Sequence, residues 1–314
     1  MSRRSDLTGA ATVTGYRAGW GLVRRLPERS AYAAFQVAAD RTYARNGKSV
    51  QRLRANYARV RPELDEAALE ALVKEGMRSY LRYFCDAFRL QLQTRESLDG
   101  IVQLEDHGDE IRAQVGAGKP LIGFLGHMGN WDLTGAWATY HFAKVTTIAE
   151  RLKPEELFEE FLEFRESLGM TIIPLTGGSA PYAAMRDALN DGGFVPLLAD
   201  RDLTSHGVEV DLCGHRAKVA AGPARLALET GAALHTIAIR YRPLPGRAMQ
   251  GITAHIGPRV PVPEGVDDNE KVRLMTQACV DVLGEQIRLH TADWHMMQRV
   301  FLDDLDPART EGAR

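Results

Sequence analysis

The sequence predicts an α/β protein with a central mixed, twisted β-sheet flanked by helices, and with amphipathic helices at the N-terminus. Three observations carry this prediction. Segments with helical periodicity alternate with short runs rich in β-branched residues, which is typical of α/β folds. The 314 residues are 45% hydrophobic, enough for one large core. Neither internal repeats nor a low-complexity linker divides the body of the chain.

The expected elements follow in a regular order. GYRAGWGLVRRLPERSAYAAFQVAADRTYAR (15–45) predicts one or two helices. In PEELFEEFLEFRESLG, the apolar side chains recur at i, i+4, i+7 and i+11, a stripe that predicts a helix packed on the core; they are Leu157, Phe161, Phe164 and Leu168. The other expected helices are 63–95, one within 101–120, 130–142, 221–231 and 270–291. The expected strands are one at the start of 101–120, then 120–126, 144–150, 170–175, 194–200, 208–214, 234–241 and 252–257.

Charge is unevenly distributed along the chain. The formal net charge is −2, yet residues 1–62 hold 13 Lys and Arg against three acids, Asp6, Glu28 and Asp40, so this segment carries +10 and the remainder −12. A basic segment on an acidic body indicates contact with anionic lipid or nucleic acid. Trp20 and aliphatic residues lie among the arginines, as in helices of the headgroup layer. An ordinary amphipathic helix docked on the body would show the same pattern. Nucleic acid is the weaker expectation, because no familiar binding motif accompanies the charge.

Composition also excludes several classes of protein. No window approaches the ~18 uninterrupted apolar residues of a transmembrane helix. The N-terminal apolar stretch is short and broken by glycines and arginines, unlike a cleavable signal, so we expect a protein of the cytoplasm. Cys85, Cys213 and Cys279 are far apart and form no CxxC, which argues against a disulfide framework or a zinc site.

The stretch FLGHMGNWDLTG contains a histidine and an acid in an HxxxxD spacing, His127 and Asp132. If a strand ends near Gly126 and Asn130 caps the next helix, His127 lies in the turn and Asp132 in the first helical turn. The acid is then placed to hold one ring nitrogen while the other takes a proton. The alternative is a histidine that caps a turn beside an aspartate favoured by the helix dipole.

Charged residues also end two other predicted strands. PLLADRDLTSHGVEVDLCG places Asp200, Arg201 and Asp202 after an apolar strand, and Glu150 ends the strand KVTTIAE. Sites in α/β proteins form where strands end, although a salt-bridged turn would look alike. The sequence contains no GxSxG elbow, no Walker A loop and no GxGxxG. Without a nucleophilic serine, a histidine–acid pair is suited to activating a hydroxyl of the substrate itself, as in direct acyl transfer to an alcohol.

Four segments together resemble a known family: GHMGNWD, AERLKPEELFEEFLEFRESLGM, PLLADRDLTSHGVEVDLCGHRAKVAAGPARLALETGA and DWHMMQRVFLDDLD. The chain is similar over about residues 15–306 to the bacterial lysophospholipid acyltransferase-like superfamily and its lipid A acyltransferase branch, and most similar to actinobacterial phosphatidylinositol mannoside acyltransferases. The resemblance implies a peripheral enzyme on the cytoplasmic face of the plasma membrane. It would move a long acyl chain, typically palmitoyl, from acyl-CoA to the 6-hydroxyl of a mannose on phosphatidylinositol mannoside.

The resemblance also implies roles for individual residues. His127 matches the base and Asp132 the acid of the HxxxxD motif. Asp200 would complete a charge relay with His127, and Glu209 is a rival for that role. The residues that would line the donor and acceptor groove are Glu150, Arg165, Arg201, Asp202, His206 and Glu229. Neither a metal nor a cofactor is implied, acyl-CoA being a co-substrate, and a monomer is expected. The aromatic residues proposed to line an apolar groove are Phe84, Phe88, Trp131 and Trp137.

We therefore expect a basic amphipathic membrane-docking segment over 1–62, an acyltransferase α/β domain over 63–306 and a tail over 307–314. The alternatives within enzymes are an acyltransferase for another glycolipid or a lysophospholipid, and a thioesterase that uses the same histidine to activate water. A non-catalytic lipid-binding protein on this scaffold is the alternative from another class.

Overall fold

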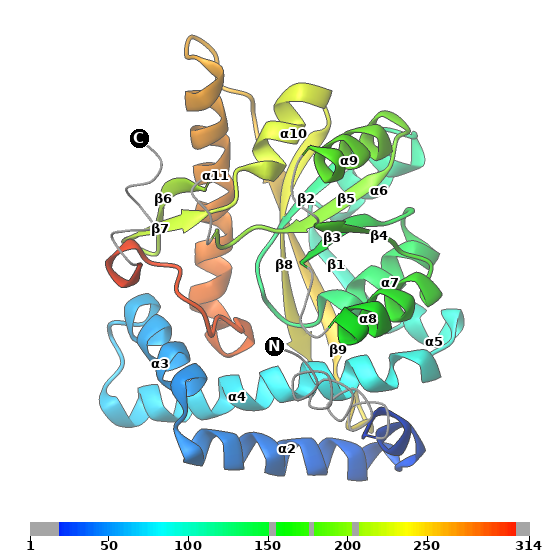
Figure 1. Ribbon diagram of the computed structural model, residues 1–314, viewed down its shortest axis with the longest axis vertical. Helices are drawn as coiled ribbons and strands as arrows, with labels where there is room; N and C mark the ends of the chain where they lie inside the picture. Colours follow the sequence, from blue (N-terminus) through cyan, green and yellow to red (C-terminus); the bar gives the residue numbers. More distant parts are fainter. Residues whose placement is uncertain (1–18, 151–154, 176–178, 203–206, 306–314) are drawn as a thin grey trace, which may run out of the picture.

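A mixed β-sheet forms the centre of the computed structural model, which describes residues 19–150, 155–175, 179–202 and 207–305 (Figure 1). Its five strands lie in the order β1-β9-β8-β2-β5, with β8 and β9 antiparallel and all other neighbours parallel. The strands are β1 (Val102–Asp106), β2 (Leu121–Leu125), β5 (Phe194–Leu198), β8 (Ala233–Arg242) and β9 (Gly251–Arg259). The predicted α/β class with a mixed sheet and flanking helices is confirmed.

Two smaller sheets adjoin the central one. β3 (Thr146–Glu150) and β4 (Thr171–Leu175) pair in parallel, and a parallel bridge from Val145 to Phe194 connects this pair to β5. β6 (Val208–Leu212) and β7 (His215–Val219) form an antiparallel hairpin. The carboxyl ends of β2, β3, β4, β5 and β8 therefore meet along one edge, where α/β proteins build their sites.

Helices cover both faces of the sheet because β2 sends alternate side chains to opposite sides. Ile122 and Phe124 pack in one core with α9 (Ala180–Asn190), α10 (Gly222–Thr230) and α11 (Asp268–Leu289). Leu121 and Leu125 pack in a second core with α6 (Gly108–Gly116), α7 (Trp131–His141) and α8 (Glu155–Ser167). Burial on both faces explains why the strands read as continuous apolar runs.

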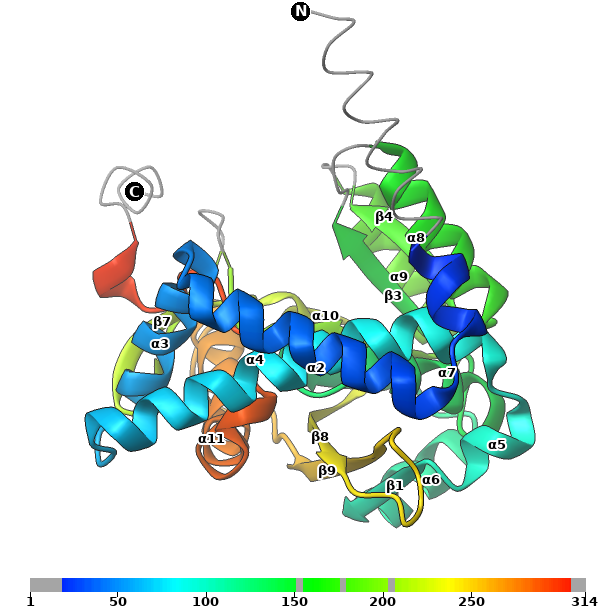
Figure 2. The same cartoon turned by 90° about the horizontal axis from the view of Figure 1, so that it is seen from below.

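Three N-terminal helices lie beyond the carboxyl edge of the sheet: α2 (Glu28–Arg45), α3 (Lys48–Val60) and α4 (Glu66–Arg89). Figures 1 and 2 show α4 crossing below β8 with α2 alongside it. The remaining short helices are η1 (Leu90–Leu92), α5 (Arg95–Asp99), η2 (Thr291–Asp293) and η3 (Leu302–Asp304). One face of α4 therefore closes the site edge of the sheet.

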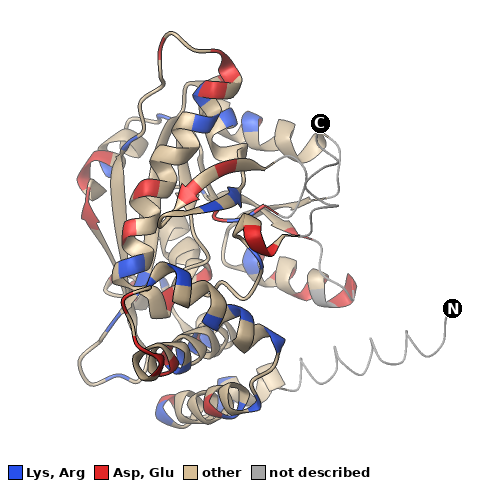
Figure 3. Ribbon diagram, turned by 90° about the vertical axis from the view of Figure 1, so that its left-hand side faces the viewer, with Lys and Arg blue, Asp and Glu red and all other residues tan. Residues whose placement is uncertain are grey.

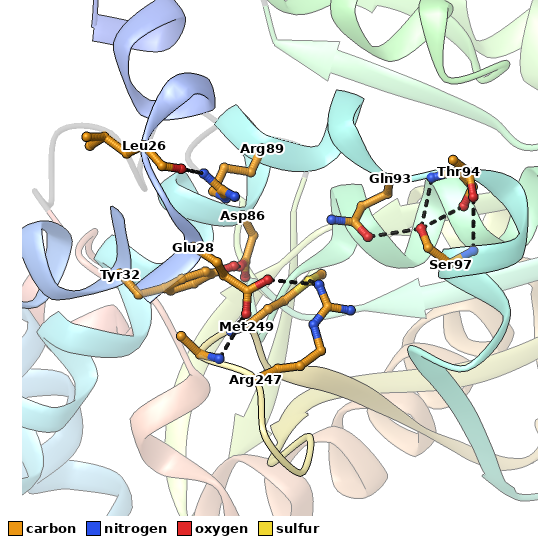
Figure 4. Close-up of polar contacts among 11 residues, drawn as sticks. Leu26, Glu28, Tyr32, Asp86, Arg89, Gln93, Thr94, Ser97, Arg247 and Met249 are labelled. Carbon is orange, nitrogen blue, oxygen red and sulfur yellow. Dashed lines mark hydrogen bonds and ion pairs between the residues drawn. The ribbon is translucent and has the colours of Figure 1, made fainter. Parts of the chain in front are cut away.

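The start of α2 is fixed to the body by polar contacts (Figure 4). The Arg89 guanidinium donates to the Leu26 carbonyl oxygen over 2.9 Å. The Glu28 carboxylate accepts from the Met249 backbone N–H and from the Arg247 guanidinium, both over 3.0 Å. The basic helix expected in this region is thus docked on the protein. No helix among the residues described is long and apolar enough to cross a bilayer.

The structure adds elements that the sequence patterns did not predict, α3, α9 and β7. In α9 the buried residues Pro181, Met185 and Leu189 recur every four positions, which is the spacing of one helix face. β7 is short and charged (HRAKV), and its pairing with β6 makes it a strand. The core stripe of α8 is borne out for Phe161, Phe164 and Leu168, which are buried. The side chain of Leu157, the first 18 residues and the tail 307–314 lie outside what the structure describes.

Candidate active site

The ends of β2 and β5 bring His127 and Asp200 together. The two strands pair in parallel with Leu125 opposite Leu198, and the Ala199 N–H donates to the Leu125 carbonyl oxygen over 2.8 Å. His127 and Asp200 each stand two residues beyond these strand ends, so they leave the sheet side by side. This register places both residues at the carboxyl edge of the sheet, as the sequence predicts.

His127 and Asp200 make the central contact of the site. Nδ1 of the His127 ring lies 2.5 Å from Asp200 Oδ1. The second oxygen, Oδ2, accepts the His127 backbone N–H and the Trp294 indole N–H, each over 2.9 Å. Of the two acids left open as partners of His127, Asp200 therefore makes the contact. Glu209 instead pairs with Arg216 across the exposed β6–β7 hairpin.

The environment of Asp200 favours its ionised form. Its side chain is inaccessible to solvent, and burial opposes ionisation. The charge and hydrogen bonds of His127, with the Trp294 donor, outweigh that penalty and lower the pKa of Asp200 below its usual value. The carboxylate then keeps a proton on Nδ1 and leaves the lone pair on Nε2. The His127 side chain is 25% exposed, and no partner of Nε2 is found within the described ranges.

The turn after His127 has the local structure that its sequence predicts. Asn130 caps α7, because its Oδ1 accepts the Leu133 N–H over 2.9 Å. Gly129 has φ +55°, and a Cβ there would lie 2.6 Å from the Ile239 carbonyl oxygen. A side chain at position 129 would therefore be strained and would also clash with β8.

Asp132 does not contact His127 as the spacing had led us to expect. Its carboxylate accepts the Arg165 Nε–H over 2.7 Å and the Tyr83 hydroxyl over 2.6 Å. Asp132 is fully buried in the first turn of α7, and its two partners come from α4 and α8. Arg165 also lies over the Trp131 ring, with its Cζ 4.4 Å from the ring centroid. Burial disfavours its charge, but Asp132 and Tyr83 raise the pKa of Arg165 above its usual value.

A second buried acid supports the same turn from α4. The Asn130 side-chain amide donates to Asp86 Oδ2 over 3.2 Å, and the Tyr241 hydroxyl donates to the same oxygen over 3.0 Å. The Tyr32 hydroxyl of α2 donates to Oδ1. Burial raises the pKa of Asp86 to about 6, against the opposing effect of these donors. Asp86 thus connects α2, α4, the cap of α7 and the end of β8.

Of the predicted substrate-binding residues, Arg165 is paired with Asp132, and the others that the structure describes lie in two further places. Glu150 at the end of β3 and Arg201 after β5 meet, with Oε2 and Nη2 3.6 Å apart. Asp202 lies next to this pair, and its backbone N–H donates to the Lys218 carbonyl oxygen over 2.9 Å. Glu229 lies on α10 against Tyr182 of α9, and its charge adds to burial in raising the pKa of Tyr182. His206 lies outside the described residues.

An apolar cavity lies between α7 and the sheet face that packs on it. Two of the four aromatic residues predicted to line a groove, Trp131 and Trp137, line this cavity. Phe84 and Phe88 are not among its lining residues; the Phe84 ring meets Tyr83 edge-on, and the Phe88 ring is tilted against Trp20. Leu125 and Trp131, which flank the His127 turn in sequence, both form the cavity wall, and His127 itself is not among the lining residues.

The sequence patterns do not point to three residues from distant segments that support the site: Tyr83 donates to Asp132, Asp86 accepts from Asn130, and Trp294 donates to Asp200. The motif DWHMMQRVFLDDLD was noted, and the segment 293–295 within it carries three hydrogen bonds to the site. In the described part of the chain, no three His, Cys, Asp or Glu side chains are grouped so as to hold a metal ion.

Comparison with known proteins gives one consistent family. The model of the bacterial lipid A biosynthesis acyltransferases matches residues 1–303. The chain is 38% identical over 310 residues to the phosphatidylinositol mannoside acyltransferase of Mycolicibacterium smegmatis, covering 98% of this chain and 97% of that relative. It is 39% identical over 311 residues to the protein of the same name from Mycobacterium tuberculosis, covering 98% and 93%. The resemblance identified from the motifs is confirmed, and the chain belongs to the bacterial lipid A biosynthesis acyltransferase family.

Proposed function

We propose that this acyltransferase moves a long acyl chain, palmitoyl, from acyl-CoA to the 6-hydroxyl of a mannose of phosphatidylinositol mannoside. It would act as a peripheral enzyme at the cytoplasmic face of the plasma membrane. The names of the two relatives support the acceptor. The observation that carries the chemistry is the 2.5 Å contact between His127 Nδ1 and Asp200 Oδ1, which leaves Nε2 available as a base.

His127 is the general base in this proposal. Nε2 takes the proton of the mannose hydroxyl while the hydroxyl oxygen attacks the thioester carbonyl carbon. The C–S bond of the tetrahedral intermediate then breaks, and the proton passes from Nε2 to the leaving sulfur, which gives free coenzyme A. Asp200 stabilises the imidazolium between the two steps. No serine or cysteine is hydrogen-bonded to His127 in the described ranges, which agrees with direct transfer without a covalent acyl-enzyme.

The first turn of α7 is suited to the developing oxyanion. The backbone N–H groups of Asn130 and Trp131 stand at the helix N-terminus, next to His127, and no acceptor for them is found within the described residues. Unpaired N–H groups and the positive end of the helix dipole favour negative charge there. Asp132 and Arg165 hold this turn against α8, so we propose a positioning role for Asp132 in place of contact with His127.

The remaining groove residues are proposed to bind the two substrates. The apolar cavity beside Trp131 would take the start of the acyl chain, since aliphatic and aromatic side chains form most of its lining. Glu150, Arg201 and Asp202 stand at the carboxyl edge where hydroxyl groups or phosphate of a substrate would be recognised. His206 and Glu229 keep the proposed substrate-binding role that the resemblance implies. No metal or cofactor enters this scheme.

The first test is transfer itself. The purified protein is incubated with palmitoyl-CoA and phosphatidylinositol mannosides, and the products are identified by mass spectrometry. We expect one palmitoyl group on a mannose and loss of this product in His127→Ala, by at least ~100-fold because general-base catalysis contributes about that much. His107→Ala is the matched control, since His107 is an exposed histidine paired with Glu110 on α6.

Other outcomes separate the alternatives. Release of coenzyme A without acylated glycolipid would indicate a thioesterase or another acceptor, which a panel of lysophospholipids and glycolipids then distinguishes. Absence of turnover with every acceptor, in a folded protein that binds acyl-CoA, would favour a non-catalytic lipid-binding protein. Wild-type turnover in folded His127→Ala would refute the assignment of the base.

A further inference from the structure

Trp294 lies at the centre of the site although it is 94 residues from Asp200 in sequence. It follows η2 near the end of the described chain, and its side chain is completely buried. Its indole Nε1–H donates to Asp200 Oδ2 over 2.9 Å. Burial alone does not give an indole such a partner in this protein, because Nε1 of the buried Trp137 has none among the described residues. The contact between Trp294 and Asp200 is therefore specific.

The backbone around Trp294 is bonded to the same turn that carries His127. The His295 N–H donates to the His127 carbonyl oxygen over 2.8 Å, and the Gly129 N–H donates to the Asp293 carbonyl oxygen over 2.9 Å. A β-bridge between Met128 and Trp294 lies between these bonds. Any shift of this segment would consequently move the His127 turn as well.

Trp294 is held in place from its other side by α3. The buried Tyr57 hydroxyl donates to the Trp294 carbonyl oxygen over 2.9 Å. The indole is thus fixed between a helix of the N-terminal layer and the carboxyl edge of the sheet. Such supported donors orient a reactive pair better than a mobile side chain would.

The two oxygens of Asp200 have different partners as a result. Oδ2 accepts from the Trp294 indole and from the His127 backbone N–H, while Oδ1 faces the His127 ring. Two donors on Oδ2 fix the rotation of the carboxylate, and both stabilise its negative charge where water is absent. We propose that Trp294 is a positioning residue for acyl transfer, which turns the Asp200 carboxylate toward Nδ1 of His127. This inference rests on the proposed role of His127 as the base.

Loss of the indole donor should change the protonation of the pair. Without the indole N–H, the pair with ionised Asp200 and neutral His127 is destabilised. The pair that has bound one more proton is destabilised less, because that proton already stabilises the carboxylate. The first proton therefore binds at higher pH. Since neutral His127 is the base, the acid limb of the kcat/KM profile should move up by about one pH unit. At pH values well below the pKa that defines the acid limb of the wild type, a shift of one pH unit lowers kcat/KM about tenfold.

No other charged group is expected to produce that shift. His295, whose backbone N–H donates to the His127 carbonyl oxygen, is neutral near pH 7, because burial and the positive charges of protonated His127 and of Arg82 lower its pKa to about 3. In the described chain, no other charged side chain on the elements that carry the site is hydrogen-bonded to the His127 ring or to the Asp200 carboxylate. Substitution of Trp294 leaves all of these side chains unchanged. They are Arg82, Asp86, Asp132, Glu150, Arg165, Arg201, Asp202, Lys218 and Asp293.

The test compares Trp294→Phe with the wild type and with Trp20→Phe. Trp20 is a buried indole that donates to the Phe88 carbonyl oxygen and is not a partner of Asp200, so its loss controls for removing a buried tryptophan. Two readouts are taken, the pH profile of kcat/KM and the pKa of His127 from NMR of ¹³Cε1-labelled histidine. We expect the acid limb and the titration of His127 to move together in Trp294→Phe and neither to move in Trp20→Phe.

The NMR titration makes the result independent of turnover. If the wild type transfers no acyl group, the proposed function fails while the titration still reports on the coupling of Trp294 to the pair. Should Trp294→Phe not fold, incorporation of 3-benzothienylalanine at position 294 keeps the shape of the ring and removes only the N–H. An unchanged acid limb and an unchanged His127 titration in a folded variant would overturn the proposal.

Discussion

A carboxylate buried without water needs a cation or donors close to it, and the two acids near the His127 turn meet this need in different ways. Asp200 is paired with a partly exposed histidine, which is the proton acceptor of the proposed mechanism. Asp132 is paired with Arg165, whose side chain is only 12% exposed and remains charged. The first pair is therefore suited to proton transfer, and the second to holding α7 in place.

This difference predicts a large loss of stability for Arg165→Met. The variant leaves Asp132 buried with only the Tyr83 hydroxyl as a partner, and breaking a buried pair typically costs about 3–5 kcal/mol of unfolding free energy. The double variant Asp132→Asn/Arg165→Met should recover a large part of that loss, because no uncompensated charge remains. Urea unfolding of the two variants beside the wild type measures both values. A cost below about 1 kcal/mol for Arg165→Met would contradict the structural role.

The parts of the site that the sequence predicts are those fixed by strand ends. His127 and Asp200 each follow an apolar run, and parallel pairing of adjacent strands places them together. The partners of Asp132 were not predictable in the same way. Tyr83 and Arg165 lie 49 and 33 residues from it, on helices whose orientation depends on the packing of the whole molecule. The short spacing in HxxxxD suggested a local pair that the helix geometry does not make.

At the level of elements, Asp86 joins four parts of the fold that are far apart in sequence. It lies on α4 and accepts from Tyr32 on α2, Asn130 at the cap of α7 and Tyr241 on β8. The site turn therefore depends on a carboxylate whose pKa burial raises to about 6 from a model-peptide value of 3.8. This shift makes the stability of the assembly dependent on pH.

The sign of that dependence follows from linkage. Between about pH 4 and pH 6 the folded protein keeps a proton on Asp86 that the unfolded chain has lost, so the contribution of Asp86 to stability falls as pH rises through this window. It should fall by about 3 kcal/mol at most and stay constant above pH 6. Asp86→Asn removes this component, and urea unfolding at a series of pH values gives the difference from the wild type. Asp303→Asn, at an exposed position, is the control and should leave the pH dependence of the unfolding free energy as in the wild type. If Asp86→Asn also shows the wild-type pH dependence, the raised pKa of Asp86 is refuted.

Most elements could be predicted from hydrophobic pattern and caps, and the exceptions have physical reasons. The runs at 120–126 and 194–200 contain β2 and β5 because both strands are buried on two faces and bounded by glycine or charge. β7 depends on its hairpin partner, with Cys213 at φ 57° and Gly214 at φ 85° in the turn. A positive φ at a cysteine is uncommon and is not signalled by residue type, so the turn and its second strand were missed.

At the scale of the whole molecule, Figure 3 shows basic and acidic positions close together on the N-terminal helices, and ion pairs take up part of the basic charge. On α3, Arg52 and Arg59 pair with Asp304, and Arg54 pairs with Glu70. On α2 and in the helical turn before it, four exposed arginines have no charged partner among the described residues; Arg29, Arg41 and Arg45 lie on α2, and Arg25 lies in the turn. The exposed apolar side chains of Leu22 and Val37 lie in the same segment. The part of this segment suited to anionic lipid is therefore α2 and the helical turn before it, while α3 serves the fold.

Membrane association can be tested by this division of charge. We predict that the protein binds phosphatidylcholine vesicles containing phosphatidylinositol and not pure phosphatidylcholine vesicles, and that added salt weakens binding. Each arginine near an anionic surface contributes about 1 kcal/mol, so Arg41→Gln/Arg45→Gln should weaken binding about 25-fold in co-sedimentation. Arg225→Gln/Arg259→Gln removes the same charge from exposed positions on α10 and β9. If both double variants lose affinity equally, net charge alone attracts the protein and α2 is not the docking surface; if neither does, electrostatic docking through α2 is wrong.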